Sequence, residues 1–61
     1  MLEKIDELLL RARHLRVRAK EVLARADTME NAHARRRMRV IAVRYQKLAQ
    51  RLEREADQNK E

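Results

Sequence analysis

The chain has 61 residues, a formal net charge of +6, and no cysteine, glycine or proline. A chain this short forms one domain at most and buries little surface, and the absence of cysteine excludes disulfide bonds and thiolate metal sites, so oligomerisation is the expected source of additional stability. The positive charge favours acidic partners such as nucleic acid or anionic lipid, although charged helix faces of this kind are also common on proteins that bind neither.

The composition predicts an all-α protein. Without glycine and proline, and with many Ala, Leu, Arg, Glu and Lys residues, the chain favours helix throughout. Tyr45 is the only aromatic residue, and no sustained alternation suggests a strand. The longest apolar runs, residues 8–10 and 40–43, are far shorter than the ~20 residues of a membrane span. No export signal is visible, so we expect a cytoplasmic protein.

The first half of the chain carries a heptad pattern. One set of residues repeats every seven positions, and a second set follows three positions later: Ile5, Ala12, Ala19 and Ala26, then Leu8, Leu15, Val22 and Met29. This a/d spacing predicts an amphipathic helix over about residues 2–28. Leu2, Leu9 and Leu23 widen the apolar stripe, which Arg16 interrupts.

A turn is expected at about residues 29–31, because the heptad pattern changes phase there. Asn31 is a preferred helix N-cap, since its side-chain oxygen accepts from free amides of the first turn. Asp27 is the competing choice, because Glu30 lies three residues later, at the spacing of a capping box.

The second helix is expected over about residues 32–57, followed by a frayed tail at 58–61. Its two repeating sets are Ala42, Ala49 and Ala56, and Met38, Tyr45 and Leu52, with Ile41 and Leu48 widening the stripe.

Antiparallel packing brings the alanines of the two halves together, with Ile5 opposite Ala56 and Leu8 opposite Leu52. A second register, with Met38, Tyr45 and Leu52 as the a set, also fits the pattern. The prediction is an antiparallel helical hairpin, single-domain over residues 1–61, that dimerises into a four-helix bundle. The candidate core and dimer residues are Leu2, Ile5, Leu8, Leu9, Leu15, Val22, Leu23, Met38, Ile41, Tyr45, Leu48 and Leu52.

The second helix resembles a group of short helical proteins of rhizobial and related α-proteobacteria. The resemblance covers about 25 residues and depends on Met38, Ile41, Ala42, Tyr45, Leu48, Ala49, Arg51 and Glu53. That group usually has Asp-Pro in place of Asn31 and Ala32, which implies that a helix starts there. The resemblance also implies a bacterial source. The group has no known activity that could be carried over to this chain. In architecture, the repeated alanines and the position of the turn resemble Rop-like regulators, which are small dimeric four-helix bundles.

Nothing in the sequence predicts an enzyme, a cofactor or a metal site. No nucleophile, base and acid share an apolar face, as a catalytic site requires. His14 and His33 have no further ligands at metal-binding spacing, and we interpret both as solvated surface residues.

Arginine is concentrated in two acid-free blocks, residues 11–20 and 35–44. The candidate nucleic-acid or anion contacts are Arg11, Arg13, Arg18, Arg35, Arg36, Arg37, Arg39 and Arg44. Apolar residues outside the seam, including Leu10, Val17, Val40 and Val43, predict a partner surface, for which a second copy or a client protein is expected. We therefore expect a non-catalytic homodimeric interaction module that acts as a small regulator or adaptor of another protein; the alternative is a sequence-nonspecific nucleic-acid-binding regulator that uses the arginine-rich surface. Membrane adhesion is disfavoured because Trp and Phe are absent.

Overall fold

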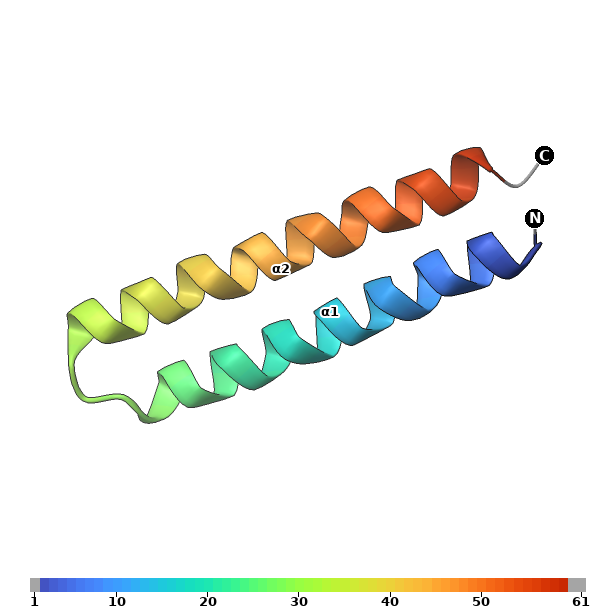
Figure 1. Ribbon diagram of the computed structural model, residues 1–61. Coiled ribbons are helices and arrows are strands. Elements are labelled where there is room, and N and C mark those ends of the chain that lie inside the picture. Colours follow the sequence, from blue (N-terminus) through green and yellow to red (C-terminus); the bar gives the residue numbers. More distant parts are fainter. Residues whose placement is uncertain (1, 60–61) are drawn as a thin grey trace.

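The computed structural model describes the backbone of residues 2–59 and the side chains of residues 4–59. It contains two helices, α1 (Leu2–Thr28) and α2 (Ala32–Gln58), which run side by side in opposite directions (Figure 1). The predicted all-α hairpin is therefore confirmed. The side chain of Leu2 and the tail residues 60–61 lie outside the described part of the chain. Gln58, which was expected in the tail, belongs to α2.

The turn is formed by hydrogen bonds that end one helix and start the next. The hydroxyl of Thr28 donates to the carbonyl of Arg25 at 2.9 Å, which satisfies one of the free carbonyl groups at the end of α1. Asn31 has an extended backbone, and its side-chain oxygen accepts from the amides of His33 at 2.8 Å and Ala34 at 3.2 Å. The prediction of Asn31 as the N-cap is confirmed, and the competing choice of Asp27 is wrong, because Asp27 belongs to the last turn of α1.

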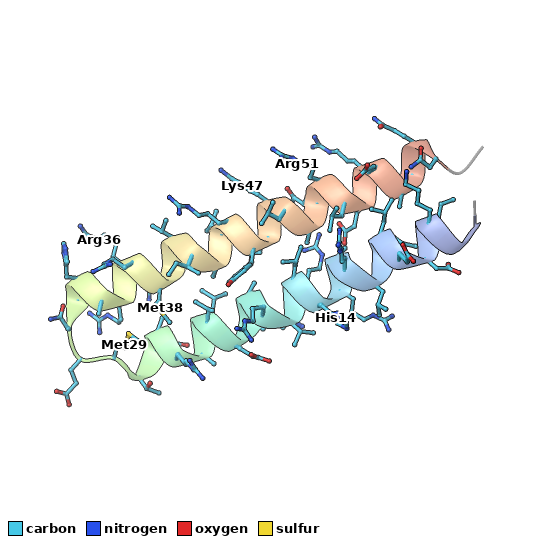
Figure 2. The ribbon with its side chains drawn as sticks, viewed as in Figure 1. His14, Met29, Arg36, Met38, Lys47 and Arg51 are labelled. Atoms are coloured by element: carbon cyan, nitrogen blue, oxygen red, sulfur yellow. The ribbon has the colours of Figure 1, made fainter. Side chains whose placement is uncertain are left out.

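Arg35 adds a further contact across the turn. It occupies the position seven residues before Ala42, where its stem lies half-buried in the seam between the helices. Its guanidinium donates to the carbonyl oxygen of Met29 at 3.4 Å, a long hydrogen bond. Met29 and Met38 lie between the two helices near the turn (Figure 2). Arg35 thus contributes to the turn and the seam.

The centre of the hairpin is a double row of alanines. Among residues 4–59, the buried apolar side chains are Ile5, Leu8, Ala12, Ala19, Ala26, Ala42, Ala49 and Ala56. Ala42 and Ala49 are 0% exposed, whereas Ile41 is 38% and Leu48 is 45% exposed. The structure therefore has the alanine-to-alanine register and excludes the second register for this hairpin. Because alanine has the smallest apolar side chain, the two backbones approach closely along the whole rod.

Larger side chains close the end of the hairpin opposite the turn. Ile5, Leu8 and Ala56 form one buried cluster, and Leu52 packs against it. These are the residues that the alanine register predicts to meet. Toward the turn, the larger side chains beside the alanines are only half-buried, among them Leu15, Val22, Leu23, Met38 and Tyr45.

The Cα atoms form a thin rod with extents of 48 × 13 × 9 Å. It is a single layer of two helices, so each helix is covered on one side only. Within the described residues, neither helix includes a stretch that is long and apolar enough to cross a lipid bilayer. The shape leaves much of the apolar stripe of each helix in contact with solvent.

Candidate interaction surfaces

One ion pair joins the two helices and identifies one side of the hairpin. Arg16 Nη2 lies 2.7 Å from Glu53 Oε1, and Arg16 Nε donates to Glu53 Oε2 at 2.8 Å, a bidentate geometry. Within residues 4–59 it is the only salt bridge. Side chains lean toward the N-terminus of their own helix, so in an antiparallel pair these two lean toward each other. The sequence analysis missed this pair and interpreted Arg16 as an interruption of the apolar stripe.

The pair changes the acid–base properties of both groups. The hydrogen bond from Arg16 lowers the pKa of the Glu53 carboxyl. Desolvation opposes this shift in the pKa, and the positive charge of Arg16 adds a further, smaller lowering. The hydrogen bond to Glu53 likewise raises the pKa of Arg16, and the charge of Glu53 contributes in the same direction. Both side chains are exposed, so solvent screens the pair and its contribution to stability is small.

The contact between Arg16 and Glu53 shows which helix positions share a side. Each of these residues follows a core alanine by four positions, Ala12 and Ala49 respectively. Residues three and four positions after an alanine lie on opposite sides of the alanine row, because a helix turns by about 100° per residue. The residues that follow an alanine by three positions therefore share the other side of the hairpin.

We call this other side the apolar flank. It comprises Leu15, Val22, Met38, Tyr45, Leu52, Ile41 and Leu48. Ile41 and Leu48 each precede a core alanine by one position, which places them on the α2 edge of the flank. On the α1 edge the equivalent positions carry Arg11, Arg18 and Arg25. The apolar flank thus has an apolar centre, one apolar edge and one basic edge.

The predicted arginines do not gather into one patch. Arg11 and Arg18 line the apolar flank, Arg13 lies toward the side of the ion pair, and Arg35 is half-buried in the seam. Arg39 also lies toward the side of the ion pair, four positions after Arg35. The remaining three, Arg36, Arg37 and Arg44, lie on the exposed surface of α2. All eight except Arg35 are exposed.

A straight row of cations occupies the side of α2 that faces away from α1. We call it the outer row of α2, and it comprises Arg37, Val40, Arg44, Lys47, Arg51 and Arg54. Figure 2 shows Lys47 and Arg51 pointing away from α1, together with the neighbouring Arg36. The sequence analysis named only Arg37 and Arg44 of this row as candidates, because it weighted the local density of arginine rather than the spacing along one face.

The His, Asp and Glu side chains, which could ligate a metal or transfer protons, are dispersed over the surface. Within the described residues, no three His, Asp or Glu side chains come close enough to hold a metal ion. His14 is exposed on the outer side of α1 (Figure 2), and His33 is exposed in the first turn of α2. The surface features that remain for interpretation are the apolar flank and the outer row of α2.

No model of a protein family, no curated protein and no solved structure matches this chain. The resemblances to the α-proteobacterial group and to Rop-like bundles therefore stay predictions.

Proposed function

We propose that the hairpin is a non-catalytic interaction module that pairs with a second copy through its apolar flank. The half-buried and exposed apolar residues of this flank carry the proposal. Ile41 and Leu48 are the clearest examples, since each retains more than a third of its surface in solvent while lying next to a fully buried alanine. A second hairpin stacked on this flank completes a four-helix bundle, which is the arrangement expected for a Rop-like protein.

The surface area of the chain supports association. The hairpin exposes 5488 Å². A compact folded chain of 7.4 kDa exposes roughly 4,200 Å², which leaves an excess of roughly 1,300 Å². A standard protein interface buries about 800 Å² on each partner. The excess is therefore large enough for a stable dimer interface on one face of the rod.

The α1 edge of the flank is compatible with a polar rim beside an apolar centre. Arg11, Arg18 and Arg25 have long aliphatic stems that cover apolar surface while their charged ends remain in water. An interface with an apolar centre and charged rim is the usual arrangement in stable complexes. The outer row of α2 faces away from α1 at the edge of the rod, beside Ile41 and Leu48, and stays accessible in such a dimer.

Sedimentation equilibrium at micromolar concentration tests the proposal. We expect a species with twice the chain mass of 7.4 kDa. A monomer that unfolds cooperatively at the same concentration would show that the hairpin is stable alone and that the apolar flank has another role.

A further inference from the structure

The two outer sides of the rod differ sharply in charge. Every position of the outer row of α2 is a cation except Val40. The equivalent positions of α1 are Glu7, Leu10, His14, Val17, Glu21 and Ala24, which include two acids and no Arg or Lys. A general excess of arginine in the composition predicts basic residues on both sides equally. The one-sided distribution therefore calls for a specific explanation.

Within residues 4–59, no carboxylate forms an ion pair with a cation of the outer row. Glu53 is bound to Arg16 on another side of the hairpin, and this is the only ion pair within residues 4–59. Glu55 follows Arg51 by four positions and Asp57 follows Arg54 by three, so these acids offset positive charge at the C-terminal end of the row only. Arg37, Arg44 and Lys47 have no acid within four residues. Their positive potentials consequently add together, which attracts an anionic partner from a distance.

The row is long, straight and regularly spaced. Arg37 and Arg54 are separated by seventeen residues, which corresponds to about 26 Å of helix, and the cations at 37, 44 and 51 are about 10 Å apart along the axis. A small anion or a single phosphorylated side chain would occupy only a fraction of this length. The matching ligand is a polymer with charge at regular intervals.

We propose that the outer row of α2 binds the phosphate backbone of double-stranded DNA. A DNA duplex carries one negative charge per about 1.7 Å of its axis, so it offers many phosphates along the row. Four of the five cations are arginines, whose planar guanidinium matches two phosphate oxygens at once. The major groove of B-form DNA is about 12 Å wide, so α2 can lie along it with the outer row turned toward the phosphates of one groove wall, whereas the narrow major groove of duplex RNA does not admit a helix.

A lipid surface fits the outer row less well than DNA. Helices that lie on membranes combine basic residues with a broad apolar face and aromatic anchors. The row itself contains one apolar residue, Val40, and Ile41, Val43 and Leu48 lie beside it. Tyr45 is the only aromatic residue and belongs to the apolar flank, so the row has no aromatic anchor. The contacts are to backbone phosphates rather than base edges, so binding discriminates little between sequences.

The test compares two pairs of substitutions that remove the same charge. The first is Arg44→Gln with Arg51→Gln, in the outer row of α2; the control is Arg13→Gln with Lys20→Gln, on α1. In both pairs the residues are exposed and seven positions apart. Binding to a fluorescent DNA duplex of about 20 base pairs is measured by anisotropy at 50 and 150 mM salt. Circular dichroism verifies that each variant remains helical.

We expect the wild-type chain to bind at micromolar concentration in 50 mM salt and more weakly in 150 mM salt. The R44Q/R51Q pair should lower the affinity by about tenfold or more and flatten the slope of log affinity against log salt by about 1–2, because two phosphate contacts are lost. The R13Q/K20Q pair should change the slope little. If the first pair unfolds the helix, Arg44→Lys with Arg51→Lys replaces it and should retain most of the affinity, since the charges are kept.

Three results would overturn the proposal. The first is the absence of wild-type binding at 50 mM salt, and the second is an equal loss for the two glutamine pairs, which would indicate attraction by net charge alone. The third is stronger binding to vesicles of phosphatidylserine than to the duplex, which would assign the row to a membrane surface. The measurement does not depend on dimerisation, so its failure would leave the homodimer proposal intact.

Discussion

Alanine repeated every seven residues determines how closely the two helices pack. The six core alanines are at most 2% exposed, although alanine is too small to fill a wide space between helices. Their burial therefore requires the backbones themselves to be close, and a larger side chain at these positions has no room. The same close approach pushes the larger neighbours, such as Ile41 and Leu48, out of the seam.

Ala42→Leu should destabilise the hairpin by about 1–3 kcal/mol, because the added atoms overpack the seam. Ala24→Leu is the matched control, since Ala24 is exposed on the outer side of α1, and its effect should be near zero. Urea unfolding followed by circular dichroism measures both free energies. Equal effects of the two substitutions would contradict the observed alanine register.

The ion pair between Arg16 and Glu53 predicts a pH effect. The pKa of Glu53 is lower in the folded chain than in the unfolded chain, because Arg16 donates hydrogen bonds to its carboxylate. The charged carboxylate therefore stabilises the fold above the ordinary pKa range of glutamate, and this contribution is lost as the pH falls through the lowered pKa. A carbon-13 NMR titration should show the pKa of Glu53 rising toward its ordinary value in Arg16→Gln. An unchanged titration curve would show that the pair does not persist in solution.

Asn31 fixes the start of α2 and with it the position of the turn. Asn31→Ala should cost about 0.5–2 kcal/mol, because the amides of His33 and Ala34 lose their acceptor, whereas Asn31→Asp should be tolerated. Asp27→Ala is the control, since Asp27 lies in the last turn of α1 and caps nothing there. Thermal unfolding of the three variants provides the measurement. A larger loss for Asp27→Ala than for Asn31→Ala would contradict the observed cap.

The sequence contained enough information for the elements of this fold. Heptad spacing predicts both helices, and the phase change together with Asn31 predicts the turn, because these depend on residues close together in the chain. It left two registers open, since Met38, Ile41, Tyr45, Leu48 and Leu52, all on one side of the alanines, form an apolar stripe as regular as the alanine row. The preference for the alanine register depends on how closely the two assembled helices pack. It is identified by the burial of Ala42 and Ala49 together with the exposure of Ile41 and Leu48.

The surfaces were harder to predict than the fold. Arg16 and Glu53 are 37 residues apart, and their contact depends on the direction in which each side chain leans across the assembled hairpin. The arginine blocks were recognised from local density, but helix geometry distributes each block around its helix. Arg11, Arg13 and Arg35 consequently lie on three different sides. The outer row of α2 instead extends through Lys47, Arg51 and Arg54, outside the dense block.

At the scale of the whole molecule, the hairpin separates its surfaces by chemistry. The apolar flank lies on one side, the Arg16–Glu53 pair marks the opposite side, and the outer row of α2 lies on an edge between them. Pairing through the apolar flank leaves both outer rows of the resulting dimer accessible. One small chain therefore has separate surfaces for association with itself and for binding an anionic polymer.

Dimerisation through the apolar flank predicts that stability depends on concentration. If folding and association are coupled, the melting temperature of the wild-type chain should rise with protein concentration. Ile41→Gln with Leu48→Gln should remove this dependence and yield a species of single-chain mass, because burying the amides without partners opposes association. Leu10→Gln with Val17→Gln is the matched control: these residues are also exposed and seven positions apart, but they lie on the outer side of α1. The control should retain the wild-type dependence. If L10Q/V17Q loses the concentration dependence of the melting temperature and I41Q/L48Q retains it, the dimer forms through the outer side of α1 and the assignment of the apolar flank is wrong.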